Sequence, residues 1–259
     1  MLNQTQINNA NSLKSEMNNK GITNPYVQTA ILGVVLKESG FNPSSKEVSY
    51  AGTSNSRIRS IFSKTKSLTD AELNSLKADK TKFFDFVYSH LGGSKYIGRG
   101  YNQLTGIDNY RFYGNKIGVD LVSKPDLVST PTIANKVLIE YMKQGIDTLK
   151  RVGKFSGKDI NDFKDQKSAY NAIYNINAGA GKNLYDANGN IKSDTTGGYK
   201  TGSDSLAWIS KNITGLKDAI IDKSKEGAEI VKKNFVPTIL ITTALLVGSV
   251  ILYKTLKQK

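Results

Sequence analysis

Apolar residues recur at helical spacing along much of this chain, whereas strict alternation of apolar and polar residues is scarce. In the segment 25–38, Val27, Ile31, Val34 and Val35 fall on one helical face, which predicts a helix with one buried stripe. The only β-structure expected is a short hairpin near 96–104, so the predicted fold class is mainly α. Similar patterns predict further helices at 2–20, 56–63, 70–76, 80–91, 132–151 and 165–176.

An uncharged segment of 19 residues, 235–253, lies near the C-terminus. As a helix it would cross roughly 30 Å of hydrocarbon, and Phe235 and Tyr253 stand where interfacial aromatic residues occur. We expect a single transmembrane helix that places the protein in a membrane; a buried core helix is the alternative. Lysines flank both sides of the segment, so the distribution of positive charge does not fix its orientation.

Two elements separate this segment from the N-terminal helices. Residues 186–205 are rich in Gly, Ser, Thr, Asn and Asp, which is typical of a linker. From Leu206 to Ile220, apolar residues are spaced by three and four, so an amphipathic helix is expected over 206–234. The alternatives for this helix are packing on the N-terminal domain, contact with the membrane surface, and self-association. The predicted organisation is a domain at 1–185, the linker, the amphipathic helix, the transmembrane helix and a basic tail at 254–259.

The charge balance favours acidic partners. Lys and Arg number 36 against 22 Asp and Glu, giving a net charge of +14, which attracts nucleic acid, anionic lipid or acidic cell-wall polymers. No basic stripe interleaved with aromatic residues accompanies this charge, so nucleic acid is not expected as a partner. Cys is absent and His90 is the only histidine, so no metal site or other cofactor is expected. Residues 1–20 lack the apolar core of a signal peptide, so none is expected.

Two glutamates occupy different local environments. Glu38 ends the apolar stripe of the segment 25–38, so we expect it to face the core or a cleft floor, where burial favours a protonated carboxyl. Glu47 lies among Ser44, Ser45 and Lys46, a polar stretch in which it should stay ionised. One protonated and one ionised carboxyl are the equipment for cleaving a glycosidic bond. Taken singly, an ordinary exposed glutamate is the alternative for each.

The motifs around these residues resemble glycoside hydrolase family 19, which contains plant-type chitinases and many phage endolysins. The similarity runs from about residue 21 to residue 181. Residues 174–179 resemble the family's Ile-Asn-Gly-Gly segment, with Ala178 replacing the first glycine. The other features that carry the resemblance are Glu38-Ser39-Gly40-Phe41, the step of nine residues from Glu38 to Glu47, Tyr50, and the block GRGYNQLTGIDNY at 98–110.

The resemblance implies a lysozyme-like helical fold and a role for each matched residue. Glu38 corresponds to the general acid, Glu47 to the general base, and Thr105 to a hydroxyl residue that holds the attacking water. Lys37 departs from the family pattern, because a histidine commonly precedes the acid, and the segment around the base is shortened. The implied substrate-binding residues are Gln103, Asn109, Asn177, Tyr101 and Arg99, of which Arg99 is expected to organise the acidic centre.

These features predict a membrane-anchored enzyme that cleaves β-1,4 bonds between N-acetylhexosamines by an inverting acid–base mechanism. Bacterial peptidoglycan is the expected substrate, and chitin is the alternative. A lytic enzyme of a bacteriophage virion, held in an internal virion membrane or a host membrane, would combine such a domain with an anchor. The rival functions are a lytic transglycosylase, which needs only the acid, and a non-catalytic anchoring protein that retains the fold.

Overall fold

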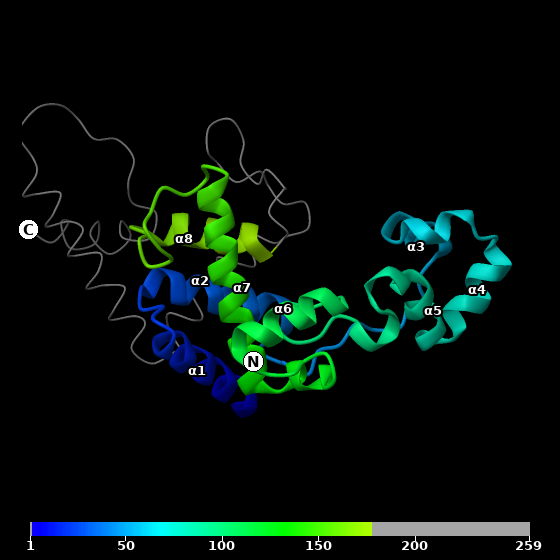
Figure 1. The fold of residues 1–259 in the computed structure, drawn as a ribbon, viewed down its shortest axis with the longest axis horizontal. Helices are drawn as coiled ribbons and strands as arrows, with labels where there is room; N and C mark the ends of the chain where they lie inside the picture. The colour runs from blue at the N-terminus through cyan, green and yellow to red at the C-terminus, as the bar shows by residue number, and fades with distance from the viewer. Residues whose placement is uncertain (1, 178–259) are drawn as a thin grey trace, which may run out of the picture. The chain divides into compact units, whose positions relative to one another are not determined.

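Eight α-helices make up most of residues 2–177, the part of the chain that the structure, a computed structural model, describes (Figure 1). The prediction of a mainly α fold is confirmed, and no helix within these residues is both long and apolar enough to cross a membrane. The predicted linker, amphipathic helix, transmembrane helix and tail lie outside the described residues. The helices are α1 (Gln4–Asn19), α2 (Pro25–Ser39), α3 (Asn55–Ile61), α4 (Asp70–Ala78), α5 (Lys80–Val87), α6 (Ile107–Ile117), α7 (Pro131–Arg151) and α8 (Gln166–Asn177), with short 3-10 helices η1 (Ser63–Ser67), η2 (Ser89–Leu91), η3 (Gly93–Tyr96) and η4 (Pro125–Ser129).

Polar side chains fix where the first two helices begin. The Asn3 side chain accepts a hydrogen bond from the Gln6 amide, and the Gln6 side chain accepts one from the Asn3 amide, which is a reciprocal cap. At the start of α2, the Asn24 side chain accepts from the Tyr26 amide, and Pro25 occupies the first helical position. These caps satisfy amides that have no partner inside the helix, so both helices begin close to their predicted starts.

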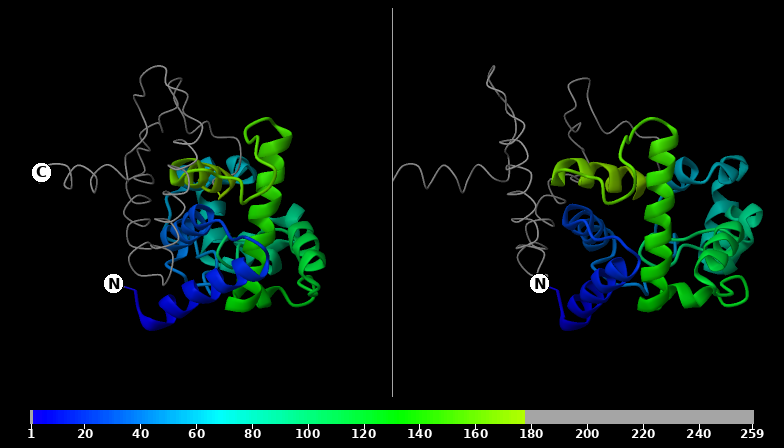
Figure 2. Two further views of the ribbon diagram at one scale, coloured as in Figure 1. Left: turned by 90° about the vertical axis from the view of Figure 1, so that its left-hand side faces the viewer. Right: turned by 60° about the vertical axis from the view of Figure 1, so that its left-hand side comes forward.

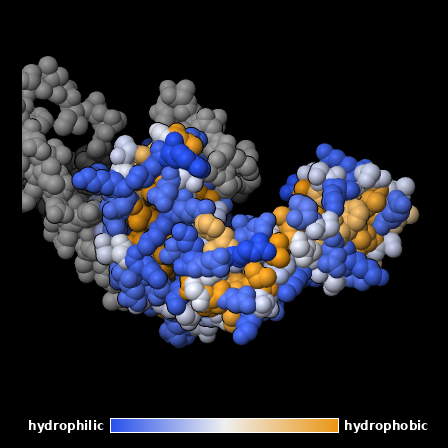
Figure 3. Space-filling model, viewed as in Figure 1, coloured by the Kyte–Doolittle hydropathy of each residue, from blue (hydrophilic) through white to orange (hydrophobic). Residues whose placement is uncertain are grey.

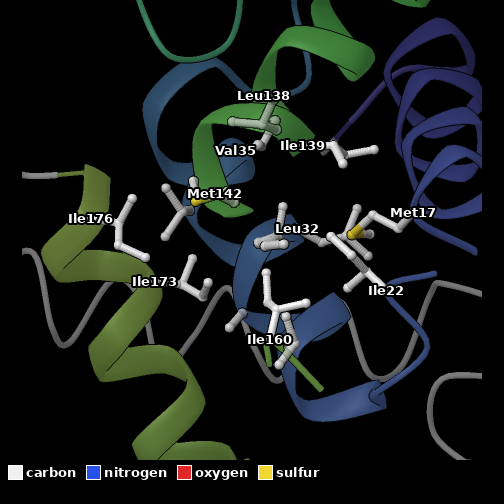
Figure 4. Close-up of a cluster of buried hydrophobic side chains, with 14 of the residues drawn as sticks. Met17, Ile22, Leu32, Val35, Leu138, Ile139, Met142, Ile160, Ile173 and Ile176 are labelled. Carbon is white, nitrogen blue, oxygen red and sulfur yellow. The ribbon is translucent and has the colours of Figure 1, made fainter. Parts of the chain in front are cut away.

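Helix α2 lies within the largest hydrophobic cluster. Every residue from Pro25 to Val35 is buried, because α1 and α8 pack against this helix. Figure 4 shows Leu32 and Val35 pointing into a cluster with Met142 of α7 and Ile173 of α8. The buried stretch of α2 is therefore covered all round, whereas the sequence pattern predicted a single stripe. It ends at Val35, one turn before the end of the helix.

Two smaller clusters hold the rest of the described chain. Helices α3, α4 and α5 lie beside an aromatic cluster that includes Phe62, Phe83 and Phe84. Helix α6 packs on α7 around Tyr110 and Leu121 (Figures 1 and 2). Because α7 also contacts α1 and α8, it links the third cluster to the one around α2. On the face drawn in Figure 3, hydrophilic residues predominate, and hydrophobic residues reach the surface between α4 and α5.

Helix α6 has no counterpart among the predicted helices. Its buried positions are Tyr110, Tyr113 and Gly114, so its buried face lacks the aliphatic residues that mark helices such as α2. A pattern based on apolar spacing therefore does not detect it.

The hairpin expected near 96–104 is reduced to two isolated antiparallel bridges, which join Arg99 to Leu104 and Lys46 to Arg99. The residues from 2 to 177 form no β-sheet. The double bridge nevertheless brings the segment that contains Glu47 alongside the Gly-Arg-Gly motif, although the two are far apart in sequence.

Candidate active site

Glu38 lies in the last turn of α2, immediately before the chain reverses. Gly40 ends the helix with a φ of 56°, in the left-handed region that glycine adopts readily. Helix α1 holds this turn, because the Gln6 side-chain amide donates to the Gly40 carbonyl oxygen at 2.8 Å. The Glu38 side chain is 41% exposed. The predicted burial of Glu38 is therefore wrong, since the buried stretch of α2 ends at Val35 and the last turn extends beyond it.

Lys37 is the charged neighbour of Glu38. Its Nζ lies 3.7 Å from Oε1 of Glu38 and 3.3 Å from the hydroxyl of Tyr174 on α8. The same ammonium group lies 4.7 Å from the centroid of the Tyr174 ring, a distance typical of a cation–π contact. Helix α8 therefore helps to hold a positive charge beside this carboxylate.

Glu47 is anchored by both its backbone and its side chain. Its amide donates to the carbonyl oxygen of Gly98 at 3.1 Å. Its Oε1 accepts hydrogen bonds from the hydroxyls of Tyr50 at 3.1 Å and Tyr88 at 2.8 Å. Within the described residues, no hydrogen bond reaches Oε2 of this carboxylate. Glu47 is half-buried against two phenols, so its surroundings are drier than the open polar stretch predicted from its neighbours.

The two phenols are fixed by the aromatic cluster. The Tyr88 ring is stacked on Phe84 with 5.7 Å between centroids and an interplanar angle of 7°. The Tyr50 ring meets Phe62 edge-on at 5.2 Å and 85°. Burial raises the pKa of Tyr50 to about 12, and the negative charge of Glu47 adds to the effect; the same causes raise the pKa of Tyr88. Both hydroxyls therefore keep their protons at neutral pH and act as donors to the carboxylate.

Tyr88 is a site residue that the sequence did not reveal. It lies 41 positions from Glu47, directly after α5 ends at Val87, inside a segment predicted to continue as helix to residue 91. Its sequence signal is its place after Phe83, Phe84 and Phe86, all in the sequence of α5. That signal indicates that Tyr88 belongs to an aromatic cluster, but it does not indicate that the Tyr88 hydroxyl contacts Glu47.

Arg99 is buried, and its guanidinium is occupied within the protein. Nη1 donates to carbonyl oxygens of the segment 95–97 at 3.0 and 3.1 Å and to the Tyr110 hydroxyl at 3.0 Å. Nε donates to Oδ1 of Asp126 at 3.0 Å, so the positive charge is paired with Asp126. Arg99 therefore fixes the backbone next to Gly98, whose carbonyl oxygen accepts the amide of Glu47.

Gln103, Thr105 and Asn109 are joined by hydrogen bonds beside the same segment. Nε2 of Gln103 donates to the Ser45 carbonyl oxygen at 3.1 Å, two residues before Glu47. The Thr105 hydroxyl donates to the carbonyl oxygen of Gln103 at 2.8 Å, and Nδ2 of Asn109 donates to that of Thr105 at 2.8 Å. Gln103 and Asn109 are exposed and Thr105 is half-buried. The structure therefore brings three of the predicted residues together near Glu47.

Tyr101 and Asn177 take other positions. Tyr101 is 3% exposed and belongs to the hydrophobic cluster around α2, so its ring lies inside the protein. Asn177 is the half-buried last residue of α8, a helix that packs along α2 and hence beside the element that carries Glu38. Within residues 2–177, no hydrogen bond joins Asn177 to either glutamate.

Glu38 and Glu47 are the two glutamates for which the sequence predicts acid and base roles. In the described part of the chain, no three His, Cys, Asp or Glu side chains lie close enough together to hold a metal ion. His90 is exposed in η2. The described residues therefore suggest no ligand set for a metal.

The sequence matches known proteins over part of its length. The family model described as Chitinase class I matches residues 85–207. The chain is also similar to "Chitinase 8" of Oryza sativa subsp. japonica, with 55% identity over 40 residues, and to "Acidic 27 kDa endochitinase" of Solanum lycopersicum, with 50% identity over 50 residues. The aligned stretches cover 15% and 19% of this chain. They span only 15% and 20% of the relatives' own lengths.

The matched family range has a clear relation to the site. It begins after Glu38 and Glu47 and includes Tyr88, the block 98–110 and Asn177. The loop that presents amides and a hydroxyl beside Glu47 is thus the part of the site that the family model covers. The family match and the two plant chitinases show that this part of the chain is similar to class I chitinases.

Proposed function

We propose that this protein hydrolyses β-1,4 glycosidic bonds between N-acetylhexosamines, with Glu38 as general acid and Glu47 as general base. The observation that carries the proposal is the arrangement of Glu47. Its amide and its Oε1 are both held, and the loop of Gln103 and Thr105 lies beside it. A carboxylate held in this way is suited to take a proton from water, which a hydrolase needs and a transglycosylase does not.

In the proposed reaction, Glu38 gives its proton to the oxygen of the leaving sugar while Glu47 takes a proton from the attacking water. The Thr105 hydroxyl holds that water. The mechanism inverts the anomeric carbon, and inversion requires a separation of roughly 6.5–9.5 Å between the two carboxyl groups to leave room for the water. In this scheme Lys37 adjusts the charge beside the acid.

The proposed contacts to the sugar come from amides. Asn109 and Asn177 each carry a donor and an acceptor that match N-acetyl and hydroxyl groups. Gln103 offers its Oε1 as an acceptor, because its Nε2 donates to the carbonyl oxygens of Ser45 and Gly100. Tyr101 and Arg99 are buried, so we assign them the support of the loop rather than contact with the sugar. This assignment changes the role expected for these two residues from the sequence.

We infer that peptidoglycan is the substrate and keep chitin as a second candidate. The net charge of +14 favours binding to the acidic polymers of a bacterial cell wall. Chitin is favoured by a different observation, since both relatives named above are chitinases. Both polymers offer β-1,4-linked N-acetylhexosamines to the same site.

Digestion of purified peptidoglycan and of chitin by the full-length protein, with the new ends identified by mass spectrometry, tests this function. The proposal expects new reducing sugar ends from one of the two polymers. A 1,6-anhydro end would instead indicate a lytic transglycosylase. No release from either polymer would favour the non-catalytic anchoring role.

We further propose that residues 235–253 anchor the protein in a membrane and that it acts as a virion-associated lytic enzyme of a bacteriophage. The lack of charge over 19 residues and the flanking lysines support the anchor. Self-association through the stripe from Leu206 to Ile220 is part of the same proposal.

The intact protein should stay with lipid vesicles through a high-salt wash, because salt screens charge but leaves hydrophobic insertion unaffected. Release by salt alone would contradict the anchor.

A further inference from the structure

Both hydrogen bonds to the Glu47 carboxylate fall on the same oxygen. The hydroxyls of Tyr88 and Tyr50 donate to Oε1 at 2.8 and 3.1 Å. Among the residues described, none donates to Oε2. Within residues 2–177, the carboxylate therefore has one oxygen that is held by two hydrogen bonds and one that receives none.

The two donors belong to one packed aromatic group. Tyr88 is stacked on Phe84 and meets Phe62 at 5.8 Å and 74°. Tyr50 also lies against Phe62 and Phe83, at 5.2 and 5.5 Å. Phe83 and Phe84 are each 1% exposed, so the rings behind the phenols are part of a close-packed core. The hydroxyls cannot move away from Glu47 unless this core rearranges.

We propose that Tyr88 and Tyr50 are positioning residues that hold Glu47 by Oε1 and direct Oε2 toward the water. The inference rests on the proposed role of Glu47 as general base. A phenol is a hydrogen-bond donor to the ionised carboxylate, so two phenols favour the form that a base requires. Fixing the rotamer of the carboxylate also supplies the orientation on which proton transfer depends.

The charged side chains near Glu47 make their contacts elsewhere, and the two phenols donate to its carboxylate. Arg57 acts on Tyr50, whose pKa its positive charge lowers slightly against the larger effect of burial. Lys46 and Arg99, which flank Glu47 in the bridged segments, both contact Asp126, at 2.8 and 3.0 Å. Tyr50 keeps its proton until about pH 12, so the two donors persist across neutral pH.

The test compares the pH dependence of full-length Tyr88→Phe, Tyr50→Phe and the double variant with that of the wild type. Phenylalanine keeps the ring in the cluster and removes only the hydroxyl. The assay is the initial rate of reducing-end release from peptidoglycan, or from chitin if that is the polymer cut. Tyr113→Phe is the matched control, because Tyr113 donates to Gln144 in another cluster.

Each single variant should lower the rate by roughly three- to tenfold and move the acid limb of the profile up by about 0.5–1 pH unit, because the ionised carboxylate loses a donor. The double variant should show the larger shift. Tyr113→Phe should leave the acid limb where it is. A merely structural role would lower the rate in proportion to the folded fraction, measured by circular dichroism, without moving the limb. That result, or unchanged profiles in all three variants, would overturn the positioning role.

Glu47→Gln in the same assay separates this inference from the proposed function. If Glu47→Gln is inactive and the phenylalanine variants behave as wild type, the positioning role is wrong and the function stands. If Glu47→Gln keeps the wild-type rate, or the wild type cuts neither polymer, the proposed function fails and the positioning role fails with it.

Discussion

The hydroxyl of Tyr88 lies 2.8 Å from Oε1 of Glu47, across 41 positions of the sequence. This bond joins the residue that follows α5 to the loop that follows α2. Through this hydrogen bond, the aromatic cluster beside α3, α4 and α5 contacts the carboxylate of Glu47. The folding of that cluster and the orientation of Glu47 are therefore expected to depend on each other.

A methyl group added at Gly98 should disturb the loop without unfolding the protein. A Cβ there would lie 2.8 Å from Oε1 of Gln103 and 3.3 Å from Oγ1 of Thr105. Both atoms are at the ends of side chains, so we expect the Gln103 amide to shift and its bond to Ser45 to weaken. Gly98→Ala should reduce the rate of polymer cleavage by roughly fivefold, the equivalent of about one hydrogen bond.

Gly52→Ala is the control for this substitution, because a Cβ at Gly52 would meet nothing within 4 Å. Its rate should equal that of the wild type. Equal rates for Gly98→Ala and Gly52→Ala would show that the position of the Gln103 amide has no effect on cleavage.

The buried guanidinium of Arg99 should contribute more to the free energy of unfolding than the exposed carboxylate of Asp126, with which it is paired. Arg99→Lys removes the fork that donates to the segment 95–97 and to Tyr110, and a lysine cannot reproduce that geometry. We expect the free energy of unfolding to fall by about 2–3 kcal/mol, because buried acceptors lose their donors. Urea denaturation followed by circular dichroism measures the change.

Asp126→Asn provides the comparison, since the Asp126 side chain is 71% exposed. Its cost should stay within about 1 kcal/mol, as for an exposed ion pair. If the two substitutions destabilised the protein equally, the ion pair, rather than the bonds to the backbone, would be the source of the stability.

Stability should decline at alkaline pH in a way that depends on Tyr50. Burial, with the charge of Glu47, raises its pKa from 10.0 to about 12. The unfolded chain therefore loses this proton at a lower pH than the folded protein does. The contribution of Tyr50 is complete below about pH 10 and is lost as the pH rises toward 12. Urea midpoints measured over this range should fall less steeply in Tyr50→Phe, and identical slopes would contradict the effect of burial on this phenol.

Whether the sequence predicts a helix depends on which kinds of side chain fill the buried face of that helix. Helix α2 was predictable, because Asn24 and Pro25 mark its start and aliphatic residues fill its buried stretch. Helix α6 was not predictable in the same way, because tyrosines and a glycine occupy its buried face. Apolar spacing thus detects a helix when aliphatic residues line its core side and fails when aromatic residues with polar groups do so.

In the candidate site, too, some features were predictable from the sequence and others were not. The motifs indicated Glu38, Glu47 and the loop of Gln103 and Thr105, and the structure places that loop beside Glu47. The exposure of Glu38 could not be predicted from its place on the stripe. Helices α1 and α8 contact the last turn of α2 at Gly40 and Lys37 but leave the side chain of Glu38 41% exposed. The contact between Tyr88 and Glu47 depends on how an aromatic cluster packs against a loop that is distant in sequence. The local sequence around either residue does not predict this packing.

The roles of Glu38 and Glu47 as acid and base are the central claim, and the rates of Glu38→Gln and Glu47→Gln test them most directly. Both variants should keep the fold, with Glu16→Gln on α1 as a control that retains wild-type activity. In reducing-end release from the polymer that the wild type cuts, Glu38→Gln should fall below detection and Glu47→Gln should lose about 10²–10⁴-fold, because each removes one proton transfer. A near-normal rate for Glu47→Gln beside an inactive Glu38→Gln would contradict the two-carboxylate mechanism and favour a transglycosylase.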